Sequence, residues 1–101
     1  MVKWNRTDAN QGKIEGCLRD IPGVSVVSIN QVGGGVPDIL VGYRGRNYLF
    51  EIKNPDQSVS KRKLKNPQKT FHMDWRGQIA VVETFGEIFA IIKENQEWES
   101  R

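Results

Sequence analysis

The sequence predicts an α/β domain in which a central β-sheet packs against helices. Apolar residues recur at helical spacing near the start of the chain, where Ile14 and Leu18 are four residues apart. Two β-branched or aromatic runs, Ile39–Tyr43 and Tyr48–Lys53, are separated by a short turn, which is typical of an antiparallel hairpin. A second helical stretch and more strand-like residues follow, and this alternation favours layers of helices and strands.

The length of the chain bounds the number of domains. With 101 residues, 38% of them apolar, it is long enough for one core and too short for two. We expect residues 1–93 to form the domain and residues 94–101 to form a polar C-terminal tail. A core of this size leaves sheet edges or helix faces uncovered, so we expect a homodimer.

The charge and the cysteine content of the chain limit the functions that it can have. The chain carries 15 Lys and Arg residues against 12 Asp and Glu residues, a net charge of +3, which suits a polyanionic partner. The single cysteine, Cys17, excludes an internal disulfide and a multi-cysteine zinc site, and we expect it in the core. The sequence has no secretory or membrane-spanning segment, so we expect a soluble protein in the cytoplasm of a bacterial or infected host cell.

The first predicted element is a helix over Asn5–Asp20. Thr7 or Asp8 can cap its start, and a Pro-Gly pair ends it. Its polar side carries Asp8, Gln11 and Glu15 on one face. The apolar residues that recur at helical spacing are Ile14, Cys17, Leu18 and Ile21.

The segments on either side of the hairpin differ in regularity. Val24–Ile29 is a β-branched run typical of a strand. Residues 31–35 are too rich in glycine for regular structure, so we expect a flexible loop there. Residues 54–65 are polar and basic, and we expect an exposed loop.

The C-terminal half is predicted to contain one helix and two strands. Pro67–Trp75 forms the helix, with proline near its first position. The strands are Ile79–Glu83 and Ile88–Ile92, around a turn at residues 85–87. The predicted order is therefore helix, three strands, helix and two strands, in a mixed central sheet flanked by helices.

Register places the polar residues of the hairpin on one face. A turn of two residues at Gly45-Arg46, or of four residues at 44–47, aligns the strands so that opposed side chains point to the same side. The opposed pairs are then Tyr43 with Tyr48, Leu40 with Glu51, and Asp38 with Lys53. Asp38, Glu51 and Lys53 share one face, and their apolar neighbours point to the other.

Two carboxylates on neighbouring strands suit a hard divalent cation, which prefers oxygen ligands and leaves positions open for water and phosphate oxygens. Asp38 and Glu51 are the expected ligands, with the backbone carbonyl of Ile52 as a third. Lys53 has two possible roles. Either its own pKa is lowered and it acts on the attacking water, or it stays charged and stabilises the transition state. We favour water activated by the cation, with Lys53 positioning it and holding charge.

The segment Gly35-Val36-Pro37-Asp38-Ile39-Leu40-Val41-Gly42, followed by Leu49-Phe50-Glu51-Ile52-Lys53, resembles the central motif of the PD-(D/E)xK nuclease superfamily. The length and the helix-first order are similar to those of small VRR-NUC nucleases and archaeal Holliday junction resolvases. This resemblance covers about residues 8–92. It implies a restriction-endonuclease-like fold and DNA cleavage with Mg²⁺ or Mn²⁺, with Asp38, Glu51 and Lys53 in the catalytic roles.

The resemblance also points to two glutamines. The family often carries a glutamate on its first helix where this chain has Gln11. Gln11 can coordinate a cation through its amide oxygen, or Asp8 or Glu15 can substitute from one helical turn away. Gln68 matches a glutamine on the helix after the motif, which implies that it orients a phosphate or the catalytic water.

Basic residues near Gln68 in the sequence are expected to neutralise DNA phosphates. They are Lys61, Arg62, Lys63, Lys65 and Lys69. His72, the only histidine, is insufficient for a zinc site and is interpreted as a structural or surface residue.

These observations predict a metal-dependent DNA endonuclease that hydrolyses phosphodiester bonds in duplex or branched DNA. The small size, without a separate recognition domain, favours structure-selective over base-specific cutting. The alternative is a nuclease-fold DNA-binding protein with impaired catalysis, because Gln11 replaces a carboxylate. A third hypothesis is a small partner-binding domain that does not use this face.

Overall fold

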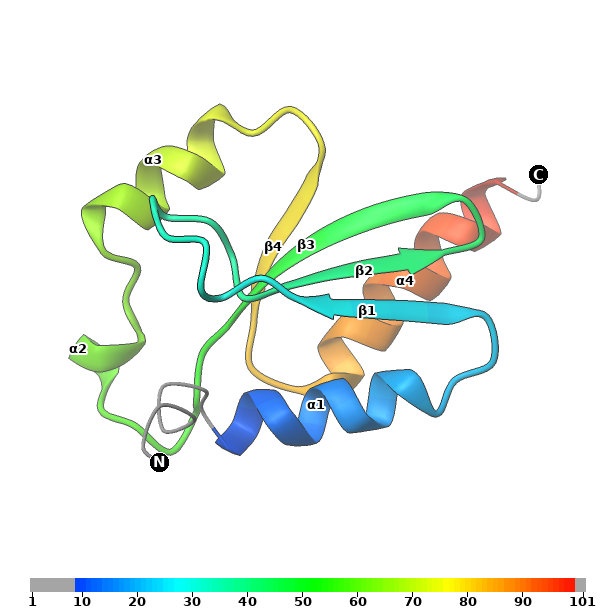
Figure 1. Cartoon of the computed structure of the whole chain (residues 1–101), viewed down its shortest axis with the longest axis horizontal. Coiled ribbons are helices and arrows are strands. Elements are labelled where there is room, and N and C mark those ends of the chain that lie inside the picture. Colours follow the sequence, from blue (N-terminus) through cyan, green and yellow to red (C-terminus); the bar gives the residue numbers. More distant parts are fainter. Residues whose placement is uncertain (1–8, 100–101) are drawn as a thin grey trace.

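A four-stranded mixed sheet forms the centre of residues 9–99, which are the residues that the computed structural model describes (Figure 1). The strands lie in the order β1, β2, β3, β4; the first two pairs are antiparallel, and β3 pairs with β4 in parallel. Their bounds are β1 Val24–Ser28, β2 Ile39–Tyr43, β3 Arg46–Ile52 and β4 Gln78–Val82. The predicted α/β class with a mixed sheet is confirmed.

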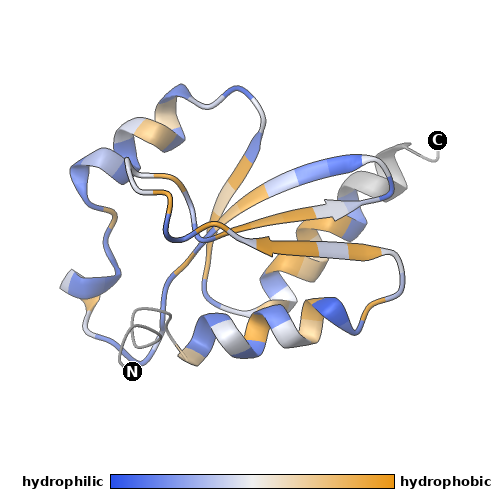
Figure 2. Ribbon diagram, viewed as in Figure 1, coloured by the Kyte–Doolittle hydropathy of each residue, from blue (hydrophilic) through white to orange (hydrophobic). Residues whose placement is uncertain are grey.

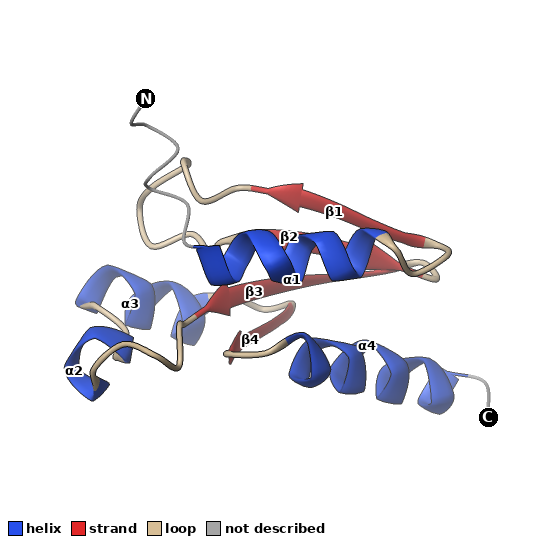
Figure 3. Cartoon of the chain, turned by 90° about the horizontal axis from the view of Figure 1, so that it is seen from below, coloured by secondary structure: helices blue, strands red, loops and turns tan. Residues whose placement is uncertain are grey.

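The parallel pair requires a long connection, because a tight hairpin joins only antiparallel strands. Helices α2 (Val59–Arg62) and α3 (Asn66–Asp74) lie in this connection between β3 and β4. In both Figure 1 and Figure 3 they lie beyond one end of the strands, the end where β2 begins and β3 finishes. The segment predicted to be an exposed loop therefore contains a short helix.

Helices α1 (Ala9–Arg19) and α4 (Phe85–Glu99) pack against one face of the sheet. A strand turns every second side chain toward the same face, so alternate strand residues complete this core. Figure 2 shows apolar residues concentrated in the strands and in α4. The buried core residues are Ile14, Leu18, Ile39, Val41, Tyr48, Phe50, Ile52, Val82, Ile88 and Ile92.

The last predicted strand is wrong, because Ile88–Ile92 lies inside α4 and the predicted turn at residues 85–87 is its first turn. A capping box begins this helix. The Thr84 hydroxyl accepts a hydrogen bond from the Glu87 N–H at 3.1 Å, and the Glu87 carboxylate accepts one from the Thr84 N–H at 3.1 Å. These bonds satisfy N–H groups that have no partner within a helix, so the cap favours a helix at this point.

The apolar residues of α4 also fit a helix. Phe85, Ile88, Phe89 and Ile92 recur at helical spacing. A short apolar run such as residues 88–92 is ambiguous by itself, because a buried strand and a buried helix segment look alike in sequence. The helix continues to Glu99, so residues 94–99, placed by composition in a polar tail, belong to α4.

The β2–β3 turn contains two residues, Arg44 and Gly45, with φ angles of 52° and 85°. Positive φ at both central residues is typical of a type I′ turn, whose twist matches that of the strands it joins. Tyr43 consequently pairs with Arg46, and the predicted pairing of Tyr43 with Tyr48 is wrong.

The other predicted pairs move by the same two residues. Leu40 pairs with Leu49 and not with Glu51. The predicted pairing of Asp38 with Lys53 is wrong for the same reason. A shift of two residues leaves every side chain on its predicted face, because side chains alternate along a strand with a period of two.

Predictions for the first helix are partly outside the described residues. Thr7 and Asp8, the expected capping residues, lie outside residues 9–99. Cys17 is exposed, so its predicted place in the core is wrong. The buried stripe of α1 runs through Ile14 and Leu18, and Cys17 lies one residue off it. No helix within the described residues is long and apolar enough to cross a membrane.

Thr84→Ala is expected to lower the free energy of unfolding by about 1 kcal/mol, because it removes the hydroxyl that caps α4. Urea denaturation measures the loss. Thr70→Ala, in an exposed position inside α3, serves as the control and should cost clearly less. Equal losses in the two variants would argue against a cap at Thr84.

Candidate active site

Asp38 lies immediately before β2, and its side chain accepts a hydrogen bond from the main chain of β3. The Asp38 N–H donates to the Phe50 carbonyl at 3.0 Å. The next bond is different: the Ile52 N–H donates to Asp38 Oδ2 at 2.8 Å. Asp38 is therefore held beside the end of β3. Ile52 itself turns its side chain into the core, as predicted.

Glu51 is a buried carboxylate, with only 4% of its surface exposed. Its Oε2 accepts a hydrogen bond from Gln68 Nε2 at 3.1 Å and lies 3.3 Å from Lys53 Nζ. Its Oε1 is buried and has no hydrogen-bond partner. The pKa of Glu51 is raised to about 7: burial is the largest cause, the negative charge of Asp38 also raises the pKa, and Lys53 lowers it.

Lys53 lies two residues after Glu51, so the two side chains leave the strand on the same side. The Lys53 side chain is largely buried, and its Nζ also donates to Gln68 Oε1 at 3.4 Å. A cation at this position offsets part of the charge of Glu51. Asp38, Glu51 and Lys53 therefore lie together, through the shared face and not through the predicted pairing.

Gln68 reaches the site from α3. It is the third residue of that helix, and its Oε1 accepts a hydrogen bond from the Lys65 N–H at 2.8 Å, which caps the helix start. The same oxygen accepts from Lys53, while Nε2 donates to Glu51. One amide thus joins the start of α3 to both charged groups of β3.

Gln11 is buried in α1, but its amide nitrogen is directed to other partners. Gln11 Nε2 donates to Glu15 Oε2 at 2.6 Å and to Ser28 Oγ at 3.3 Å. Glu15 also pairs with Arg19 at 3.3 Å. Within residues 9–99 no group of three Asp, Glu, His or Cys residues is placed to hold a metal ion. Glu15 therefore does not add a third carboxylate to Asp38 and Glu51, and Asp8 lies outside the described residues.

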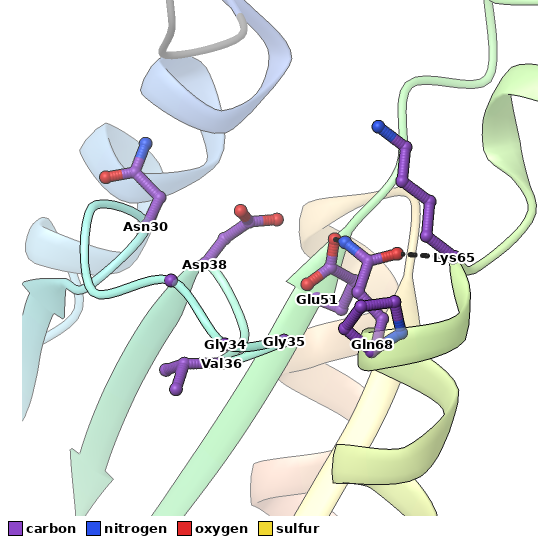
Figure 4. Close-up of a pocket in the computed structure, with 10 residues that line it drawn as sticks. Asn30, Gly34, Gly35, Val36, Asp38, Glu51, Lys65 and Gln68 are labelled. Carbon is purple, nitrogen blue, oxygen red and sulfur yellow. Dashed lines mark hydrogen bonds between the residues drawn. The ribbon is translucent and has the colours of Figure 1, made fainter.

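A pocket of about 320 Å³ lies beside the two carboxylates (Figure 4). The loop between β1 and β2 forms one wall, with Asn30 and Gly33, Gly34 and Gly35, and the start of α3 forms another, with Lys65 and Gln68. Asn30 and the three glycines are not among the site residues predicted from the sequence. The glycine run that ends three residues before Asp38 is the available signal in the sequence, since it marks backbone that leaves space.

The residues present fit a divalent cation. The carboxylates of Asp38 and Glu51 repel each other, because the charge of Asp38 raises the pKa of Glu51. In addition, Glu51 Oε1 is a buried acceptor without a donor. A hard cation takes carboxylate oxygens as ligands and would remove both penalties. Asp38 and Glu51 are the side chains that would hold it.

The predicted basic residues differ in their surroundings. Arg62 lies 3.0 Å from Glu83 Oε2, so its charge is already paired. Lys65 lines the pocket. The lysines of the cluster are all exposed, on or next to α2 and α3: Lys61, Lys63, Lys65 and Lys69.

His72 lies one turn after Gln68 on α3 and is partly buried. Its Nε2 is enclosed and has no hydrogen-bond partner. Desolvation lowers the pKa of His72, and the positive charge of Lys53 lowers it further. Both effects favour a neutral imidazole.

Comparisons with known proteins give no family for this chain. No protein-family model matches its sequence, and no curated protein or solved structure matches it either. A functional proposal therefore depends on the arrangement of the residues around Glu51.

Glu51→Gln is expected to stabilise the metal-free protein at high pH. The pKa of Glu51 is raised from 4.5 to about 7 by folding, so the unfolded chain loses this proton first and stability falls as pH rises from 4.5 through 7. The variant should gain about 1 to 3 kcal/mol near pH 8.5 and almost nothing near pH 4.

Urea denaturation in the presence of a chelator measures this difference at the two pH values. Glu94→Gln, at an exposed position of α4, is the matched control and should change stability little at either pH. An equal gain for Glu51→Gln at both pH values would contradict the charge-based explanation.

Proposed function

We propose that this protein is a metal-dependent DNA endonuclease with a restriction-endonuclease-like arrangement of its sheet. The observation that carries the proposal is the buried Glu51 carboxylate, which has one oxygen without a partner beside Asp38 and a pocket. The other oxygen of the same carboxylate forms an ion pair with Lys53 and accepts a hydrogen bond from Gln68. Two carboxylates and an amide at one pocket, with the Lys53 ammonium next to Glu51, are suited to phosphodiester hydrolysis.

Mg²⁺ or Mn²⁺ is the proposed cofactor. Held by Asp38 and Glu51, it would supply positive charge for activating water and for polarising the scissile phosphate. The Ile52 N–H keeps Asp38 directed toward the end of β3. Burial of Glu51 limits its motion, so both carboxylates are preorganised for a cation.

Lys53 and Gln68 have distinct proposed roles. The Lys53 ammonium, 3.3 Å from Glu51, holds positive charge where negative charge develops on the phosphate oxygens. Gln68 holds Lys53 and Glu51 in place through the two ends of its amide and orients the attacking water or a phosphate. Water adds its oxygen to phosphorus as the P–O bond to the 3′ oxygen breaks, and the 3′ oxygen takes up a proton. The family resemblance implies a 5′-phosphate product.

DNA is the proposed substrate because exposed lysines lie on the helices beside the pocket. Lys65 lines the pocket, and Lys69 follows Gln68 on α3. Lys61 and Lys63 extend the same charge onto α2 and its end. Such contacts read the backbone and not the bases, which favours structure-selective cutting. A homodimer would bring two sites to a duplex or a branched DNA.

A catalytically impaired DNA-binding protein remains the second candidate. The observation that favours it is the direction of Gln11, whose amide nitrogen is bonded to Glu15 and Ser28. Only two carboxylates of the described residues then lie at the pocket. Such a protein would bind DNA through the same lysines without cutting it.

Cleavage of supercoiled plasmid and branched DNA with Mg²⁺ or Mn²⁺ tests the proposal. Asp38→Asn, Glu51→Gln and Lys53→Ala should each lower the rate by at least about 100-fold, because each removes charge from the site. Asp74→Asn, at an exposed position of α3, should retain cleavage. Cleavage that survives in the Glu51 and Lys53 variants would rule out this site, and binding without cleavage by the unmodified protein would favour the second candidate.

Lys65→Ala and Lys69→Ala should each weaken DNA binding and reduce the slope of log affinity against log salt by about one, because each lysine neutralises one phosphate. Fluorescence anisotropy over a salt series measures the slope. Lys93→Ala, at an exposed position of α4, should leave it unchanged. An equal effect of all three substitutions would mean that net charge, and not the surface beside the pocket, governs binding.

A further inference from the structure

The glycine loop, residues 33–35, closes against the start of α3 at one position. All three glycines have positive φ, at 84°, 67° and 86°. A Cβ atom added to Gly33 or Gly34 would meet no atom within 4 Å. A Cβ added to Gly35 would overlap the carbonyl oxygen of Pro67 and lie 2.6 Å from its carbonyl carbon. Gly35 is therefore the one of these three glycines at which a side chain would collide with α3.

The contact at Gly35 is made with backbone and cannot be relieved by a side-chain rotation. The same added Cβ would lie 3.1 Å from the backbone nitrogen of Gln68. An alanine at this position would require the loop or the first turn of α3 to move, because protein atoms do not approach so closely. A movement of that turn displaces Gln68.

The first turn of α3 is not held by buried side chains. None of the residues of α3 is classed as buried, so the helix has no side chain anchored deep in the core. Gln68 nevertheless has to bring its amide within 3.1 Å of Glu51 and 3.4 Å of Lys53. Hydrogen bonds of this length tolerate displacements of only a few tenths of an ångström. The distance between the glycine loop and α3 therefore determines whether Gln68 can form its hydrogen bonds with Glu51 and Lys53.

We propose that Gly35 is a positioning residue: by lacking a side chain it lets the first turn of α3 pack on the glycine loop, and so places the Gln68 amide between Glu51 and Lys53. Its effect on cleavage rests on the proposed nuclease function. Its effect on the position of Gln68 does not.

A double-mutant cycle tests whether Gly35 acts through Gln68. Gln68→Ala and Gly35→Ala should each lower kcat for plasmid cleavage by about 10- to 100-fold, with a much smaller change in KM. In the Gln68→Ala background, Gly35→Ala should cause little further loss. Losses that multiply in the double variant would overturn the proposal, because they would show that Gly35 acts by another route.

Gly45→Ala is the matched control for backbone strain. Gly45 has φ 85°, close to that of Gly35, but an added Cβ meets no atom within 4 Å, and its turn is distant from the pocket in the sheet. Both variants place alanine at positive φ, so they share that strain. Only Gly35→Ala should reduce kcat and alter the Gln68 side chain; an equal loss in Gly45→Ala would overturn the proposal.

NMR spectroscopy provides a test that needs neither metal nor DNA. In the unmodified protein, a nuclear Overhauser effect is expected between the α protons of Gly35 and the backbone amide proton of Gln68, and this measurement does not depend on a variant folding. The side-chain amide signals of Gln68, assigned by their loss in Gln68→Ala, should shift in Gly35→Ala and not in Gly45→Ala. Absence of the Overhauser effect would overturn the proposal, whereas absence of cleavage alone would count against the nuclease function.

Discussion

The carboxylate of Glu51 is buried on the face of the sheet opposite the apolar core, and the neighbouring segments are arranged around its charge. Removing a carboxylate from water is costly unless hydrogen bonds and opposite charge replace the water. Lys53 supplies the charge and Gln68 supplies a donor, but both act on one oxygen. The other oxygen has no partner, and Asp38 adds further negative charge. The protein therefore concentrates negative charge at a pocket, which a hard cation would neutralise.

The groups around Glu51 come from segments that the core does not hold directly. α1, α4 and one face of the sheet bury the apolar residues. The glycine loop and α3 lie beyond the end of the strands and meet through the backbone contact at Gly35 (Figure 1). Gln68 then joins α3 to β3. The core thus fixes the two carboxylates and the lysine, while close contacts outside the core set the position of the amide.

Sequence reasoning failed where a local pattern fits two structures. The apolar residues 88–92 fit a strand or a helix, and the capping box of Thr84 and Glu87 was the signal for the helix that the strand interpretation overlooked. Gln11 shows a different limit. Its place on the polar side of α1 followed from spacing, but its bond to Ser28 depends on how α1 packs against β1.

The sequence by itself determined that Asp38, Glu51 and Lys53 leave the hairpin on one face, because alternation along a strand has a period of two and survives any even shift. The tertiary structure alone determined the register, through positive φ at Arg44 and Gly45, and the contact of Gln68 with the two charged groups of β3. Those features depend on turn geometry and on the approach of segments far apart in the chain. Periodicity carries no information about either, because it is a property of neighbouring residues only.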